Sequence, residues 1–80
     1  MEYEKHFLSE DFTHLNVQIN RMHQSSLDVI DFTLQGDLKK AEQAAHQIYK
    51  ALNIVKALNS KKVIRDDQER HAMATRKAFF

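Results

Sequence analysis

Four of the five histidines follow an acidic residue by four positions. Side chains four residues apart meet on a helix, and an oppositely charged pair there stabilises the helix by about 0.2–0.5 kcal/mol. We therefore expect these histidines to act mainly as local helix stabilisers. The four pairs are Glu2 with His6, Glu10 with His14, Glu42 with His46, and Asp67 with His71.

Metal binding and pH sensing are alternative roles for the same side chains. Carboxylate-bridged di-metal bundles use Glu-x-x-His, with the ligands three residues apart, and the sequence does not contain this motif. A His-x-x-x-His pair is absent as well. We predict no metal and no cofactor, and we keep a pH switch as a minor hypothesis because histidine titrates at about pH 6.5.

Nucleophilic catalysis has little support in the sequence. It needs an activated serine, cysteine or lysine together with a base and an oxyanion site. Cysteine is absent, the four serines stand in no recognisable catalytic setting, and one glycine cannot make a phosphate-binding loop. We predict that the chain is not an enzyme. Phe12, Met22 and Phe32 are typical of a helical core, with a ligand or haem pocket as the alternative.

Few helices are available to position these side chains. The 80 residues make one domain at most, and they contain one glycine and no proline. Because a β-rich fold of this length needs several turns, the composition predicts an all-α protein with long helices. A domain this small buries only about 60% of its unfolded surface, and no disulfide compensates. Oligomerisation is therefore expected.

Apolar residues recur at alternating steps of four and three, which is a heptad seam. The pattern predicts one helix over about 10–35 and another over 38–59. Val17 and Phe32 fall outside the seam and are candidates for a second apolar strip that meets a partner. The seam residues, expected in the core or in an oligomer contact, are Leu8, Phe12, Leu15, Ile19, Met22, Val29, Leu38, Ala41, Ala45, Ile48, Leu52 and Val55.

The clearest break is the Gly36-Asp37 pair. Gly36 suits the left-handed position that ends a helix, and Asp37 suits the N-cap of the next one. Ser9 is the expected N-cap of the first helix. So short a connection makes the two helices antiparallel neighbours. The second helix should offer a face of small residues to the large residues of the first, namely Ala41, Ala44, Ala45 and Ala51.

The apolar pattern becomes sparse beyond the hairpin. Asn59-Ser60 is predicted to interrupt the second helix, because both residues favour caps and turns. A helical extension to about residue 78 follows. We predict that residues 64–80 form an interaction arm, since arginine and large aromatics are enriched at binding hot spots. A frayed helix end is the alternative. The candidate partner-binding residues are Arg65, Arg70, Met73, Arg76, Lys77, Phe79 and Phe80.

Charge is unevenly placed although the net charge is only +1. Residues 1–36 hold two basic and six acidic residues, whereas residues 37–80 hold ten basic and five acidic ones. An acidic helix folded back on a basic one is the simpler interpretation. A nucleic-acid-binding dimer that uses the basic second half is the alternative. No stretch suits a membrane span or a signal peptide, so a cytoplasmic location without membrane contact is expected.

In outline, the hairpin over 10–60 resembles Rop-type antiparallel hairpins, which dimerise into four-helix bundles, and the small hairpin chaperones of type III secretion. The resemblance is one of architecture and transfers no site residue. We therefore expect a single all-α domain over 1–80, an antiparallel helical hairpin with a C-terminal helical extension that dimerises into a helical bundle.

The predicted function is a non-enzymatic protein-binding module: an adaptor, inhibitor or regulator that offers a helix face to another protein. The homo-oligomer is expected to be a dimer. An assembly or chaperone subunit of a phage or secretion system is the remaining alternative.

Overall fold

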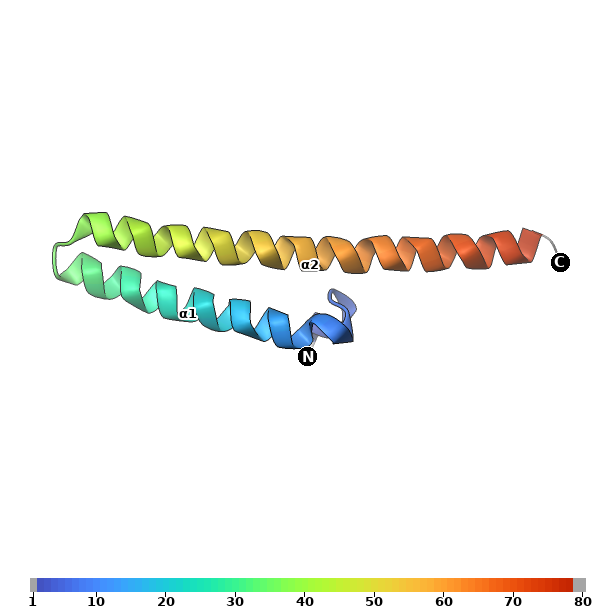
Figure 1. Ribbon diagram of the computed structural model, residues 1–80, viewed down its shortest axis with the longest axis horizontal. Coiled ribbons are helices and arrows are strands. Elements are labelled where there is room, and N and C mark those ends of the chain that lie inside the picture. Colours follow the sequence, from blue (N-terminus) through green and yellow to red (C-terminus); the bar gives the residue numbers. More distant parts are fainter. Residues whose placement is uncertain (1, 79–80) are drawn as a thin grey trace.

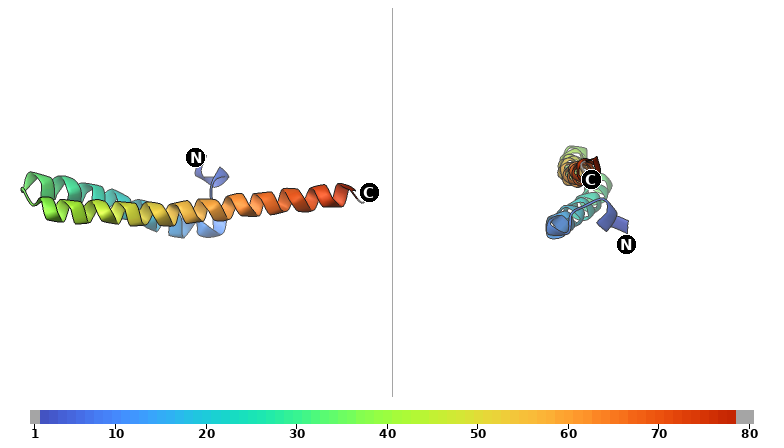
Figure 2. Two further views of the ribbon diagram at one scale, coloured as in Figure 1. Left: turned by 90° about the horizontal axis from the view of Figure 1, so that it is seen from above. Right: turned by 90° about the vertical axis from the view of Figure 1, so that its right-hand side faces the viewer.

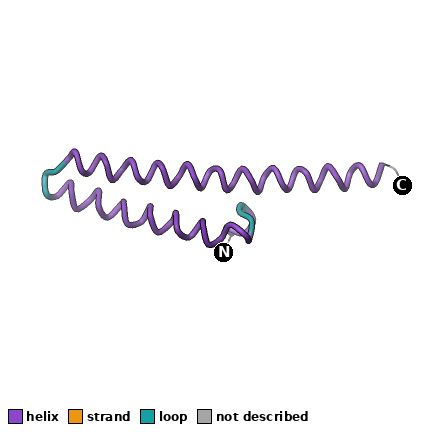
Figure 3. Tube along the Cα trace, in the orientation of Figure 1, coloured by secondary structure: helices purple, strands orange, loops and turns teal. Residues whose placement is uncertain are grey.

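The protein is a helical hairpin in which the second helix is much longer than the first (Figure 1). The computed structural model describes residues 2–78, and the side chains of residues 3–71. The described residues contain helices and no strand (Figure 3), which confirms the predicted all-α hairpin. The elements in chain order are the 3-10 helices η1 (Glu2–Lys5) and η2 (Ser9–Asp11) and the α-helices α1 (Phe12–Leu34) and α2 (Leu38–Ala78).

The turn between α1 and α2 is a Schellman motif. Gly36 has a φ of 78°, in the left-handed region that glycine enters without steric cost. The N–H of Asp37 donates to the carbonyl of Phe32 at 2.9 Å, and the N–H of Gly36 donates to the carbonyl of Thr33 at 3.1 Å. Asp37 Oδ1 then accepts the N–H of Lys40 at 3.2 Å. The predicted roles of Gly36 and Asp37 are both confirmed.

The start of α1 differs from the prediction. Ser9 begins the 3-10 helix η2, and α1 starts three residues later, so Ser9 is not its N-cap. Asp11 precedes α1 without making a side-chain capping hydrogen bond. The carboxylates of Glu10 and Asp11 instead reach across to α2, where they meet two basic side chains. Contact with the second helix, rather than a local cap, therefore holds the beginning of α1.

Helix α2 runs without interruption for 41 residues, against 23 in α1. The predicted break at Asn59-Ser60 is wrong. Either residue costs a helix at most about 0.7 kcal/mol relative to alanine, which packing easily outweighs. The side-chain amide of Asn59 also has a partner without any turn, because it donates to the carbonyl of His6 at 3.0 Å.

The molecule is an open layer of two helices, 68 × 20 × 15 Å (Figure 2). Its radius of gyration is 18.6 Å, where a compact domain of this length has about 12 Å. Its accessible surface is 6543 Å², where a folded monomer of 9.4 kDa exposes about 5,000 Å². The buried apolar residues of the described part are few: Leu8, Leu15, Ala41, Ala44, Ala51 and Leu58. One layer of helices thus leaves much apolar surface uncovered.

Candidate protein-binding surface

Small residues of α2 form its side of the contact with α1. Ala51 is completely buried, and Ala41 and Ala44 are each 8% exposed. Ala45 is only half-buried. Because alanine has little side-chain bulk, the two helices approach closely along this row. The predicted alanine face is therefore confirmed for three of its four members.

The opposing row on α1 is not the one that the heptad pattern suggested. Besides Leu8 and Leu15, the buried positions are polar: Asp11, Gln18 and Ser25. Gln18 Oε1 is buried without a hydrogen-bond donor. A seam in which one row is partly polar and the facing row is mostly alanine gains little from apolar burial, which contributes about 25 cal/mol per Å². The hairpin contact alone is therefore a weak source of stability.

Three of the twelve predicted seam residues are buried, and nine are not. Leu8, Leu15 and Ala41 are buried between the helices. Ile19 and Leu38, by contrast, are 48% and 66% exposed. The other seven are half-buried. We call the nine that are not buried the apolar face; they are Phe12, Ile19, Met22, Val29, Leu38, Ala45, Ile48, Leu52 and Val55.

The N-terminal segment contacts one side of the two-helix layer at the open end of the hairpin. The ring of Tyr3 meets the ring of Phe12 edge-on, with a centroid separation of 5.0 Å. The carbonyl of His6 accepts the amide of Asn59, which is one heptad beyond Leu52 on α2. Figure 2 shows this segment standing off one side of the two helices. One short segment therefore contacts both helices at the open end of the hairpin, at Phe12 on α1 and at Asn59 on α2.

Another part of the hairpin surface is mostly polar. A shallow hollow there is lined by residues of both helices, mostly polar: Asp28, Phe32, Lys40, Gln43, Ala44 and Gln47. Phe32 carries the ammonium group of Lys40 at 5.8 Å from its ring centroid, a cation–π contact. Phe32 is thus occupied within the chain. Val17, its predicted companion in a second strip, is 56% exposed on α1.

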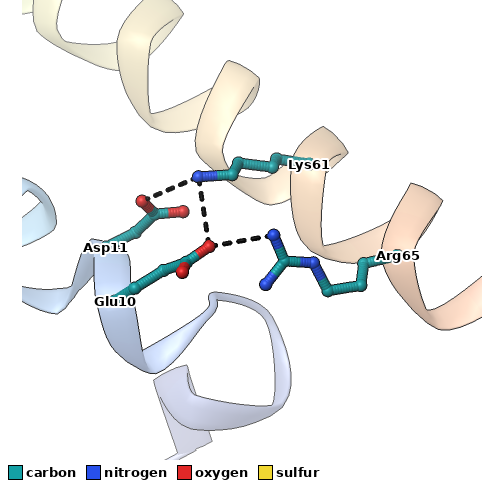
Figure 4. A network of polar contacts seen from close by, with 4 residues as sticks. All are labelled: Glu10, Asp11, Lys61 and Arg65. Carbon is teal, nitrogen blue, oxygen red and sulfur yellow. Dashed lines mark hydrogen bonds and ion pairs between the residues drawn. The ribbon is translucent and has the colours of Figure 1, made fainter.

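Four charged residues close the open end of the hairpin (Figure 4). Lys61 Nζ lies 3.2 Å from Asp11 Oδ1 and 3.4 Å from Glu10 Oε1, and Arg65 Nη2 lies 2.9 Å from the same Glu10 oxygen. Hydrogen bonding to Asp11 raises the pKa of Lys61 above its ordinary value of 10.5, and Glu10 adds to the effect. These contacts join the acidic first half of the chain to its basic second half, as the charge distribution suggested.

The predicted interaction arm has a different composition in the structure. Arg65 belongs to the charged network at the open end, so it is held within the chain. Arg70 is exposed on α2 beyond the hairpin. The side chains of Met73, Arg76 and Lys77, together with Phe79 and Phe80, lie outside the described residues. Sequence reasoning missed Glu10 as the partner of Arg65, because a contact 55 positions away leaves no local signal.

The acidic and histidine side chains of the described residues do not gather into a metal-binding cluster. No group of three or more histidine, cysteine, aspartate or glutamate side chains among the described residues is placed to hold a metal ion. Glu10, predicted to pair with His14, instead contacts Lys61 and Arg65. No helix within the described part of the chain is apolar over the length that a bilayer crossing requires.

Comparison with known proteins adds no family assignment, since no protein-family model, curated protein or solved structure matches the chain.

Proposed function

We propose that this chain is a non-enzymatic protein-binding module, and that the apolar face of its hairpin packs against another helical protein surface. The observation that carries the proposal is the uncovered apolar face, above all Ile19 and Leu38 with exposures of 48% and 66%. Monomeric soluble proteins seldom expose a contiguous apolar patch of this kind without a partner. Helices that present apolar residues at heptad spacing bind other helices by bundle-completing contacts.

The polar residues within this face support the proposal. Ser26 and Thr33 interrupt the apolar row on α1, and a buried hydroxyl without a partner would oppose binding. Both hydroxyls already donate within the helix, Ser26 Oγ to the carbonyl of Met22 at 2.8 Å and Thr33 Oγ1 to that of Val29 at 2.6 Å. A partner can therefore cover these positions without leaving a donor unsatisfied.

Nucleic-acid binding is the weaker candidate. Such proteins neutralise phosphates with lysine and arginine side chains gathered on one surface. Four basic residues of the second half contact carboxylates: Lys61 and Arg65 in the charged network, Lys62 with Asp66 at 2.9 Å, and Lys40 with Asp37 at 3.8 Å. These pairs reduce the positive potential that the sequence suggested.

Affinity capture from the native host tests the proposal with matched baits. Ile19→Asp places a charge on the apolar face, whereas Val17→Asp makes the same kind of change at a similarly exposed position elsewhere on α1. We expect the wild-type and Val17→Asp baits to retain the same protein and the Ile19→Asp bait to lose it. Equal recovery by all three baits contradicts the proposal.

A further inference from the structure

We infer that the partner of the apolar face is a second copy of this chain, packed face to face in the antiparallel sense so that the turn of each copy lies at the open end of the other. The inference rests on the proposed function and names the partner of the same surface. It draws on three features of the chain: the area of the face, its gradient of side-chain size and the placement of the N-terminal segment.

The area of the face suits a stable dimer. Helix α1 has 23 residues and is therefore about 35 Å long, and two adjacent helices are about 18–20 Å wide. The footprint is about 650 Å² on each copy, or about 1,300 Å² in total, within the range of specific interfaces. Each chain exposes about 1,500 Å² more surface than a compact monomer of its mass, and this excess is larger than the footprint on one copy.

The row of the face on α1 changes from large to small side chains between its two ends. On α1, the row that begins with Phe12 and Ile19 at the open end continues with Ser26 and Thr33 towards the turn. On α2, the face near the turn contains the large Leu38 and the small Ala45, so the gradient is confined to α1. A twofold axis through the middle of the face sets the large end of each copy against the small end of the other. Such alternation is how helical layers interdigitate.

The antiparallel arrangement is consistent with a twofold axis between the two copies. In a twofold interface, the same patch serves on both copies, so residue i meets residue j and j meets i. The parallel alternative would set Phe12 against Phe12 at one end and Thr33 against Thr33 at the other. It would crowd the first end and leave a gap at the second, and both faults destabilise a packed interface.

The N-terminal segment defines where the second copy stops. Its contacts with Phe12 and Asn59 place residues 3–6 on the apolar face at the open end. In the antiparallel arrangement, the turn of the second copy reaches this segment and cannot move past it. The segment thus fixes the axial register of the two copies.

Sedimentation equilibrium and one distance measurement test the inference. We expect a dimer of the 9.4 kDa chain at micromolar concentration. Val17→Asp should leave the dissociation constant unchanged. Ile19→Asp should raise it at least about 100-fold, since each dimer then buries two unpaired carboxylates. Circular dichroism spectra with unchanged helix content verify that the hairpin still folds in both variants.

The distance comes from a spin label on Gln35→Cys, an exposed position at the turn in a chain without other cysteines. The antiparallel dimer separates the two labels by about the length of α1, roughly 35 Å, and a parallel dimer by less than about 20 Å. The short distance, or a monomeric wild type, overturns the inference. If the wild type is monomeric while, in the affinity capture, the Ile19→Asp bait loses a different protein that the wild-type bait retains, only the choice of partner is wrong. If that bait loses nothing, the proposed function fails too.

Discussion

Ala51 gives the most direct measure of how closely the two helices pack. Its side chain is completely buried, so Ala51→Leu adds three carbon atoms where the structure has no room. Overpacking of this kind costs about 1–3 kcal/mol, because the helices must move apart or the new side chain must leave its preferred rotamer. For a domain of this size, each kcal/mol lowers the melting temperature by about 4–8 °C. We therefore expect the melting temperature to fall by about 5–20 °C.

Ala57→Leu is the matched control for this prediction. Ala57 lies on the same helix but is exposed, so the two variants share the change in helix propensity and differ in packing. Thermal melts followed by circular dichroism should be compared at equal protein concentration, since association with another copy would raise the melting temperature. If Ala51→Leu melts within about 2 °C of Ala57→Leu, α1 does not pack against this row of α2.

Three further predictions follow from other parts of the hairpin. Gly36→Ala should destabilise the protein by about 1–2 kcal/mol in urea unfolding, because an added Cβ meets no neighbour and only the positive φ opposes it; Gly36→Asn should cost less. The stability that Lys61 contributes through its raised pKa is present below pH 10.5 and is lost as the pH rises through the higher pKa of the folded state. The difference in unfolding free energy between wild type and Lys61→Gln should therefore shrink above pH 10.5. A chain ending at Asp66 retains the charged network and should keep the hairpin while losing any partner bound by the arm; unchanged binding would show that the arm is only a tail.

Local chemistry made the turn predictable from the sequence. A lone glycine followed by aspartate specifies the end of one helix and the cap of the next, and both interactions lie within a few residues of the turn. The antiparallel arrangement follows from the shortness of this connection. No distant residue is needed for either conclusion.

The position of the interhelix contact was less accessible to sequence reasoning. Two rows of side chains on α1 are offset by one residue, one containing Asp11 and the other Phe12. The large apolar side chains of the row with Phe12 predicted that this row packs against α2. The structure buries the first row, because small residues such as Ser25 on α1 and Ala51 on α2 permit a closer approach of the helices. The heptad pattern therefore gave the wrong side for the closest helix contact.

Long-range contacts account for the remaining differences. Arg65 was assigned to an interaction arm because its partner Glu10 is remote in the sequence. Asn59 was expected to break α2, although its amide is satisfied by the carbonyl of His6 from the other end of the chain. Single-residue preferences below about 1 kcal/mol carry little weight against such tertiary contacts.

The unbroken course of α2 has a mechanical consequence. Residues 63–78 extend about 24 Å past the hairpin, at 1.5 Å per residue, in rigid connection with the part that packs on α1. Because this segment contains no glycine or proline, we expect it to move together with the part of α2 that packs on α1, pivoting at the charged network. A tilt of about 10° at that point displaces the far end by about 4 Å. A ligand that alters helix packing in the hairpin would thus move the far end of α2.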